Sequence, residues 1–194
     1  MTYRILVVCT GNICRSPAVQ LLLTRAVDDS VLVTSAGTAA LPGWAIDDRM
    51  AAHLREDAIR TDAFRSRPLT ADLMAGADLI VTATAAHRAP ALALQPSAVR
   101  RTVTLGELSR LASHLPRGAA QGADDAGRLA ALVPAALALR PRFLGQDGDD
   151  DVPDPYGRPD DEYWRSYAWL RHHVGRLVTS LREGVNPVST PRAL

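Results

Sequence analysis

The stretch RILVVCTGNICRSP, residues 4–17, decides the fold of this 194-residue chain. Its first five residues are aliphatic or β-branched apart from the leading arginine, which predicts a short buried strand. Gly11 and Asn12 follow in a loop, and both residue types tolerate unusual backbone angles. Ser16 and Pro17 then predict a helix start, with serine as the cap and proline as the first helical residue. The stretch therefore predicts a strand, a tight loop and a helix in direct succession.

The rest of the chain alternates between short apolar runs and helical patterns. We expect further strands at residues 31–36, 78–82 and 101–105, and helices at residues 17–28, 47–54, 69–72, 85–94, 106–112, 124–139 and 160–183. Pro134 should kink or split the helix that contains it. Strands that alternate with helices favour a parallel sheet covered on both faces. We therefore expect an α/β fold with a four-stranded parallel sheet.

The composition is that of a globular protein without an obvious polyanionic partner. Hydrophobic residues make up 47% and charged residues 22% of the chain, and the formal net charge is +1. This near-neutral balance gives no electrostatic case for binding nucleic acid or a membrane. The apolar runs are far shorter than the roughly 20 residues of a transmembrane helix, and the first residues lack the pattern of a signal peptide. We expect a cytoplasmic protein.

Residue counts exclude several kinds of chemistry. The chain has no lysine, which rules out a Walker-type phosphate lysine and a Schiff base. Two cysteines cannot build a disulfide scaffold or a four-cysteine zinc site. The five histidines show no metal-ligand spacing, and the acidic run at residues 147–151 lacks the pattern of a calcium loop, so we expect it to be a solvated loop. We therefore expect neither a metal nor a cofactor.

The loop after the first strand carries a cysteine and an arginine six positions apart, Cys9 and Arg15. Small and turn-forming residues between them let successive backbone N–H groups point inward, and such a nest at a helix N-terminus binds a tetrahedral anion. Arg15 can fork onto two oxygens of that anion, and the same field stabilises a thiolate at Cys9. Ser16 can cap the helix and also hydrogen-bond the sulfur. The alternative is a buried cysteine that merely precedes a helix.

The segment CTGNICRSP, residues 9–17, resembles the phosphate-binding loop of the low-molecular-weight protein tyrosine phosphatases. The resemblance continues in four further segments outside a central insert: Ser35–Thr38, Arg67–Thr70, Asp78–Val81 and Val152–Gly157. The last of them, VPDPYG, is similar to the general-acid loop of that family. The resemblance implies a flavodoxin-like fold with the phosphate-binding loop after the first strand, at the carboxyl edge where the strand order reverses.

The resemblance also implies roles for individual residues. Cys9 is the expected nucleophile of a cysteinyl-phosphate mechanism, Arg15 the phosphate clamp and Asp154 the general acid and base. The expected substrate-binding residues are Thr10, Gly11, Asn12, Ile13, Cys14, Ser16, Trp44 and Tyr156. Asn12 should hold the loop in shape, with Ser35 within reach of it. Cys14 is either a small loop filler or the partner of Cys9 in a reversible disulfide that protects the nucleophile.

The chain departs from the family pattern around the expected cleft. Residues 39–43, AALPG, stand where an aromatic wall residue is usual, and Trp44 either replaces that wall or belongs to the core. Phe64 or Arg65 occupies the place of a histidine that supports the loop, and Thr84 the place of an acidic residue. An insert at about residues 113–151 either lies over the active site or packs on the outside. These differences bear on the substrate rather than on the phosphate chemistry.

The sequence thus predicts one phosphatase-like domain, residues 1–184, followed by a frayed tail, residues 185–194. The expected activity is hydrolysis of a phosphotyrosine protein or a small aryl phosphate ester, with phosphate or a similar oxyanion bound in the loop. A phosphate-binding module that has lost efficient catalysis and acts as a sensor or partner is the alternative. Arsenate reduction is a further one, although it needs additional cysteines for a relay and Cys14 alone is available.

Overall fold

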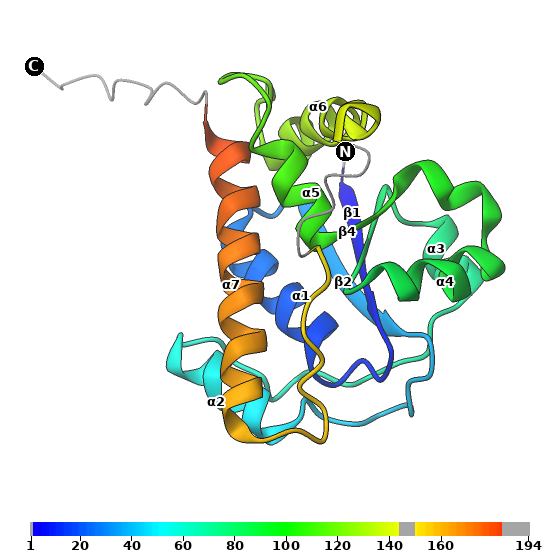
Figure 1. Ribbon diagram of the computed structural model, residues 1–194, viewed down its shortest axis with the longest axis vertical. Helices are drawn as coiled ribbons and strands as arrows, with labels where there is room; N and C mark the ends of the chain where they lie inside the picture. Colours follow the sequence, from blue (N-terminus) through cyan, green and yellow to red (C-terminus); the bar gives the residue numbers. More distant parts are fainter. Residues whose placement is uncertain (1, 144–149, 184–194) are drawn as a thin grey trace, which may run out of the picture.

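The computed structural model describes residues 2–143 and 150–183. Its centre is a four-stranded parallel sheet with the order β2-β1-β3-β4 (Figure 1). The strands are β1 (Tyr3–Cys9), β2 (Val31–Gly37), β3 (Leu79–Thr82) and β4 (Thr102–Thr104). The order reverses beside β1, because β2 lies on one side of it and β3 on the other. The expected flavodoxin-like α/β fold is therefore confirmed.

Helices cover both faces of this sheet (Figure 1). They are α1 (Arg15–Ala26), α2 (Asp48–Glu56), α3 (Ala71–Ala75), α4 (Arg88–Leu94), α5 (Leu105–Ala112), α6 (Asp125–Leu137) and α7 (Asp160–Arg182), with 3-10 turns η1 (Ala85–His87), η2 (Pro96–Arg101) and η3 (Arg140–Phe143). Helices α1, α2, α5 and α7 lie on one face, and α3 and α4 lie on the other. Within residues 2–143 and 150–183, no helix has the length and apolar character of a membrane span.

Alternation along β1 explains the two layers. Ile5 and Val7 point into the larger core beneath α1, α5 and α7, whereas Leu6 and Val8 point into the smaller core beneath α3 and α4. All four side chains are at most 1% exposed. A strand that is buried on both faces has a continuous run of apolar residues in its sequence, and residues 5–8 have this pattern. This packing fixes the carboxyl end of β1, and with it the loop that follows.

Two details of the helices differ from the expectations. Helix α1 begins at Arg15 with Cys14 as its N-cap and no capping side chain. Ser16 is therefore the second residue of the helix rather than its cap, and its hydroxyl contacts Cys9 and Asn12. Within α1, Val19 and Leu23 are buried, whereas Leu22 and Ala26 are only partly buried. Helix α6 runs through Pro134 as one element, so the proline does not split it.

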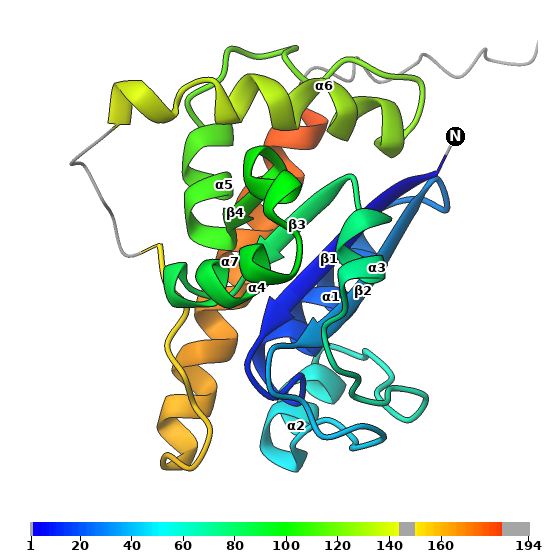
Figure 2. The same cartoon turned by 90° about the vertical axis from the view of Figure 1, so that its right-hand side faces the viewer.

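The described part of the insert packs outside the active site. Helix α6 lies at the amino end of β1, opposite the loop at residues 9–15 (Figure 2). Two reciprocal hydrogen bonds attach it there: the Asp125 N–H donates to the Asp28 carboxylate at 3.0 Å, and the Asp28 N–H donates to Asp125 at 2.9 Å. Asp125 is 2% exposed. Of the two placements expected for the insert, this part therefore takes the outer one; residues 144–149 and the tail lie outside the described residues.

His173 on α7 makes stability depend on pH. Burial, together with the charges of His172 and Arg176 and against the opposing charge of Asp150, lowers the pKa of His173 to about 4. The ring contacts the Ser109 hydroxyl at 2.6 Å. An unfolded histidine has a pKa near 6.5, so between that value and about 4 the unfolded chain binds a proton that the folded chain does not. We expect the free energy of unfolding to fall by about 1–2 kcal/mol from this group between pH 7 and pH 5.

Urea unfolding of the wild type and the His173→Gln variant at several pH values measures this contribution. The glutamine variant keeps a polar partner for Ser109 but cannot titrate, so its free energy of unfolding should fall less steeply with decreasing pH. Identical slopes for the two proteins would contradict the prediction.

Candidate active site

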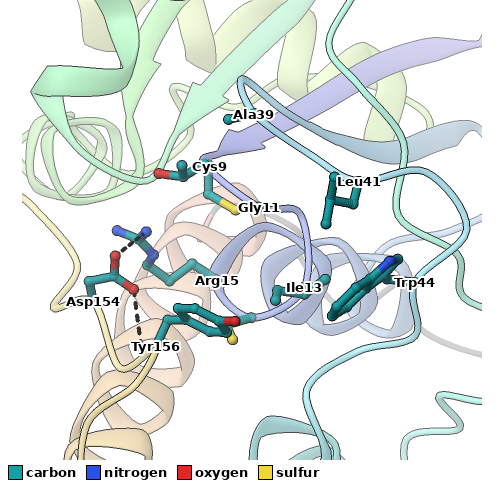
Figure 3. A pocket seen from close by; sticks show the side chains of 11 residues that line it. Cys9, Gly11, Ile13, Arg15, Ala39, Leu41, Trp44, Asp154 and Tyr156 are labelled. Atoms are coloured by element: carbon teal, nitrogen blue, oxygen red, sulfur yellow. Dashed lines mark hydrogen bonds and ion pairs between the residues drawn. The ribbon is translucent and has the colours of Figure 1, made fainter.

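The loop of residues 9–15 lies at the carboxyl end of β1 and leads directly into α1. It forms one side of a cavity of about 270 Å³ (Figure 3). The cavity is lined by Cys9, Thr10, Gly11, Ile13, Cys14, Arg15, Ala39, Leu41, Trp44, Asp154 and Tyr156. The loop at the end of the first strand, the segment after β2 and the segment before α7 therefore meet in one place.

Asn12 organises the loop from within. It adopts a positive φ of 54°, a conformation that asparagine tolerates better than most residues, and its side chain is fully buried. Its amide nitrogen donates to the Ser35 hydroxyl at 2.8 Å and to the Ser16 hydroxyl at 2.9 Å, and its amide oxygen accepts from the Arg67 N–H at 3.0 Å. The expected approach of Ser35 to Asn12 is therefore present.

The segment SAGT, residues 35–38, holds the start of the loop. The Thr38 N–H donates to the Cys9 carbonyl, and the Ala39 N–H donates to the Thr10 carbonyl, both at 2.9 Å. A side chain at Gly37 would place its Cβ 2.4 Å from the Thr10 oxygen, which no real Cβ tolerates. Glycine is required there because the two backbones touch.

The two cysteines differ in their surroundings. Cys9 is 2% exposed, and its Sγ lies 2.9 Å from the Ser16 hydroxyl. Burial raises the pKa of the Cys14 thiol to about 12, and the negative charge of Asp47 adds to the effect. Both are free thiols. Cys14 therefore stays protonated at neutral pH, and a disulfide between the two cysteines remains a prediction.

Arg15 and Asp154 form an ion pair across the cavity. An Arg15 guanidinium nitrogen lies 2.7 Å from an Asp154 carboxylate oxygen (Figure 3). The arginine side chain is 6% exposed and the aspartate side chain 52% exposed. The carboxylate is therefore open to a molecule that enters from solvent, whereas the guanidinium is fixed by its burial.

The amino-terminal side of the Asp154 segment is tied to the end of β3 and to α5. The Val152 N–H donates to the Ala83 carbonyl at 3.0 Å, and the Asp151 carboxylate accepts from the Ala85 N–H at 2.7 Å. Asp150 forms a two-pronged pair with Arg110, at 2.5 and 3.0 Å. The expectation of a solvated acidic run is thus wrong for Asp150, which is partly buried against Arg110, whereas Asp151 is exposed although it accepts a hydrogen bond.

The carboxyl-terminal side of this segment is held by Arg49 on α2. Its guanidinium donates to the Arg158 carbonyl at 2.8 Å and to the Tyr163 hydroxyl at 2.9 Å, and it stacks over the Tyr163 ring at 4.0 Å. Tyr163 in turn donates to Asp47, the N-cap of α2. Asp154 therefore stands on a segment that is anchored at both ends.

Apolar side chains form the outer walls of the cavity. Trp44 is 53% exposed and lines the cavity, so it is not a core residue (Figure 3). Tyr156 and Leu41 are both 60% exposed and line the same cavity. Leu41 was not expected from the sequence, because an isolated leucine beside a proline carries no functional signal.

At the positions where the family pattern is altered, other groups contact the loop. Phe64 is buried in the larger core, and it is the Arg67 backbone that bonds Asn12. Thr84 contacts the His87 ring at 2.6 Å, and the same ring contacts the Thr10 hydroxyl at 2.9 Å. Nothing in the sequence singled out His87, because a lone histidine on a short helix gives no signal before its neighbours are known.

Gly106 on α5 sets the position of the Asp154 segment, because a Cβ there would lie 2.5 Å from the Asp150 Cα and 2.6 Å from its carbonyl oxygen. We expect Gly106→Ala to push Asp150 away, to lower the free energy of unfolding by about 1–3 kcal/mol and to lower turnover.

The matched control is Gly175→Ala on α7, where a Cβ meets nothing within 4 Å. That variant should be stabilised by about 0.5–1 kcal/mol. Urea unfolding and aryl phosphate hydrolysis measure both, and a Gly106→Ala protein as stable and active as the wild type would contradict the prediction.

Among residues 2–143 and 150–183, no cluster of three or more histidine, cysteine, aspartate or glutamate side chains could hold a metal ion.

The chain is similar to a known protein family and to several of its members. The family model described as "low molecular weight phosphotyrosine protein phosphatase" matches residues 4–115. A probable low molecular weight protein-tyrosine-phosphatase, EpsP of Ralstonia solanacearum, is 38% identical over 110 residues, 57% of this chain and 75% of EpsP. A protein-arginine-phosphatase of Geobacillus stearothermophilus is 36% identical over 182 residues, 94% of this chain and 98% of the relative.

The solved structure of the YwlE arginine phosphatase from Geobacillus stearothermophilus matches with a TM-score of 0.68 at 28% identity, over 93% of both chains. The family match spans more than half of the chain and includes the loop at residues 9–15, all of β1 except its first residue, and strands β2 to β4. The sequence, the sheet order and the comparisons agree: this chain belongs to the low molecular weight phosphotyrosine protein phosphatase family, whose members are hydrolases.

Proposed function

We propose that the protein hydrolyses aryl phosphate monoesters, phosphotyrosine in proteins above all, through a cysteinyl-phosphate intermediate. One observation carries the proposal: Cys9, Arg15 and Asp154 line the same cavity, and apolar side chains wall its entrance. A tetrahedral oxyanion fits the loop, because a nest at a helix N-terminus with an adjacent guanidinium binds such anions.

In the first step the Cys9 thiolate attacks phosphorus, and the bond from phosphorus to the ester oxygen breaks. The entering phosphate competes with Asp154 for the Arg15 guanidinium, which the carboxylate contacts at 2.7 Å in the structure. Asp154, once protonated, donates its proton to the departing oxygen. A phenol with a pKa near 10 leaves slowly as an anion, so this proton transfer is worth about 10²–10⁴ in rate.

In the second step the Asp154 carboxylate takes a proton from water, and the water oxygen attacks phosphorus. The phosphorus–sulfur bond breaks, phosphate forms and the Cys9 thiolate is restored. The Ser16 hydroxyl, 2.9 Å from Cys9 Sγ, donates to the departing thiolate and stabilises its charge.

The walls of the cavity favour a neutral ring over a charged group. Ile13, Leu41, Trp44 and Tyr156 present apolar or aromatic surface, and Asp154 supplies the one carboxylate among the lining residues. Binding of a phenyl ring there is favoured by a free energy of about 25 cal/mol for each Å² of apolar surface that it removes from water. A guanidinium in the same place would face few partners for its N–H groups.

Phosphoarginine is the second candidate substrate. The protein-arginine-phosphatase relative matches 94% of this chain at 36% identity, including the insert, whereas EpsP matches 57%. This likeness favours phosphoarginine, whereas the apolar walls of the cavity favour phosphotyrosine, so the two substrates must be compared directly.

The test compares turnover of one peptide in two forms, phosphorylated on tyrosine or on arginine, together with p-nitrophenyl phosphate and a metal chelator. We expect kcat/KM to be higher for the phosphotyrosine peptide. Faster turnover of the phosphoarginine peptide would assign the second substrate. Phosphate binding without any turnover would instead indicate the binding module, and arsenate-dependent thiol oxidation would indicate the reductase.

We also propose that the protein works in the cytoplasm as one domain, residues 1–184. A nucleophilic thiol beside a second free cysteine needs a reducing compartment. Helix α7 packs against α1, α2, α5 and α6, which supports a single folding unit.

A further inference from the structure

The five residues after β3, Ala83 to His87, contact both the loop at residues 9–15 and the segment that carries Asp154. We name them the 83–87 turn. Its Ala83 carbonyl and Ala85 N–H bind the segment that carries Asp154, through the Val152 N–H and the Asp151 carboxylate. Its His87 ring binds the Thr10 hydroxyl, in the residue that follows the nucleophile. The turn thus joins the two segments through hydrogen bonds at its two ends.

His87 is built into this turn. Its ring is 7% exposed and lies between two threonine hydroxyls, with Nε2 at 2.9 Å from Thr10 and Nδ1 at 2.6 Å from Thr84. Burial lowers the pKa of His87, and the Arg15 charge lowers it further against opposing effects of Asp154 and Asp151. A neutral imidazole has one donor and one acceptor nitrogen, which matches two hydroxyls that each donate and accept.

Thr10 is held from two sides. Its carbonyl accepts from the Ala39 N–H at 2.9 Å, and its hydroxyl contacts His87. The first contact fixes the loop to the segment after β2, on the far side of the cavity from Asp154. The second contact connects the loop, through the 83–87 turn, to the segment that carries Asp154.

We propose that His87 is a positioning residue that, through Thr10, sets the placement of Cys9 relative to Asp154. The inference rests on the proposed two-step mechanism and deepens it. In-line attack needs the sulfur and the acid on opposite sides of phosphorus, and a misplacement of 1 Å can cost about 10² in rate. His87 touches neither the cavity nor the reacting atoms; it acts through its contact with Thr10.

The test measures kcat/KM for two esters that differ in their need for the acid. Phenol is a poor leaving group and needs the proton of Asp154, whereas p-nitrophenol leaves readily without it. We expect His87→Ala to lower kcat/KM by about tenfold for p-nitrophenyl phosphate and by about 10²-fold for phenyl phosphate. A merely structural role would lower both by the same factor, through loss of folded protein.

Thr84 supplies a matched pair of variants outside the cavity. Thr84→Val keeps the side-chain shape but removes the hydroxyl that orients His87, so the loss on phenyl phosphate should again exceed that on p-nitrophenyl phosphate. Thr84→Ser keeps the hydroxyl and should restore both values. The control is Thr102→Val at the amino end of β4, which removes a buried hydrogen bond to the Ala98 carbonyl far from the site. It should leave the ratio of the two esters unchanged.

Three results separate the possibilities. Equal losses on both esters in folded His87→Ala and Thr84→Val, or no loss, would overturn the inference while leaving the proposed function standing. A Thr84→Ser protein as impaired as Thr84→Val would overturn it as well. A wild type that turns over neither ester would overturn the proposed function, and the inference with it. Circular dichroism and thermal unfolding of each variant show which proteins are folded.

Discussion

Replacing Cys9 by serine should lower the turnover rate by about 10⁴-fold or more while the protein stays folded. Serine is nearly the size of cysteine, so the buried position beside Ser16 is filled in much the same way. A serine hydroxyl, however, does not ionise at neutral pH and is a far weaker nucleophile. The Arg15 guanidinium and the loop are unchanged, so the variant should still bind phosphate.

The measurement combines p-nitrophenyl phosphate hydrolysis with calorimetric titration of inorganic phosphate. Cys14→Ser is the matched control, since it makes the same exchange in the same loop at a thiol that burial keeps protonated. It should lose far less turnover than Cys9→Ser. Substantial hydrolysis by Cys9→Ser would exclude a cysteinyl-phosphate intermediate, whereas a loss of phosphate binding would mean that the substitution had disturbed the loop itself.

The parts of the site that the sequence predicted are those set by neighbours along the chain. The strand, the loop and the helix at residues 4–17 depend on local apolar runs and turn residues, and the structure has all three. The parallel sheet follows from the same alternation of strands and helices, whereas the reversal of the strand order was implied by the family resemblance and is present in the order β2-β1-β3-β4. Cys9 and Arg15 lie in one loop, so the spacing alone placed them together.

The contacts that the sequence did not predict join residues far apart in the chain. Arg110 and Asp150 are 40 positions apart, and Thr10 and His87 are 77 positions apart. Neither pair has a local signal, because an arginine or a histidine on a helix is equally suited to solvent. The error at Ser16 is instead a local one: α1 begins at Arg15, two residues before the predicted start, so Ser16 lies within the helix, and its hydroxyl contacts Cys9, as predicted, and Asn12.

The place of the insert is a third example. Its helix α6 carries an apolar stripe that any exposed apolar surface could have covered. The position is decided by Asp125 in the insert and Asp28 in the connection from α1 to β2, because the backbone N–H of each donates to the carboxylate of the other. An aspartate at a helix N-terminus usually caps its own helix, so no local pattern indicates that these two residues pair.

Replacing Asp154 by asparagine should lower kcat/KM by about 10²–10⁴ for phenyl phosphate and by much less for p-nitrophenyl phosphate. Asparagine fills the same space and still accepts a hydrogen bond from Arg15, but it can neither donate an acidic proton nor act as a base. It also removes a negative charge 2.7 Å from the guanidinium, so phosphate should bind at least as tightly as in the wild type.

Asp161→Asn is the matched control for this variant, because Asp161 is an exposed residue on α7 that pairs with Arg165 and lies outside the cavity. It should leave both esters unaffected. Equal losses on the two esters in Asp154→Asn would mean that Asp154 places the substrate rather than protonates the leaving oxygen. The steeper loss on phenyl phosphate, together with unweakened phosphate binding, would assign the proton transfer to Asp154 itself, since only that step depends on the basicity of the departing oxygen.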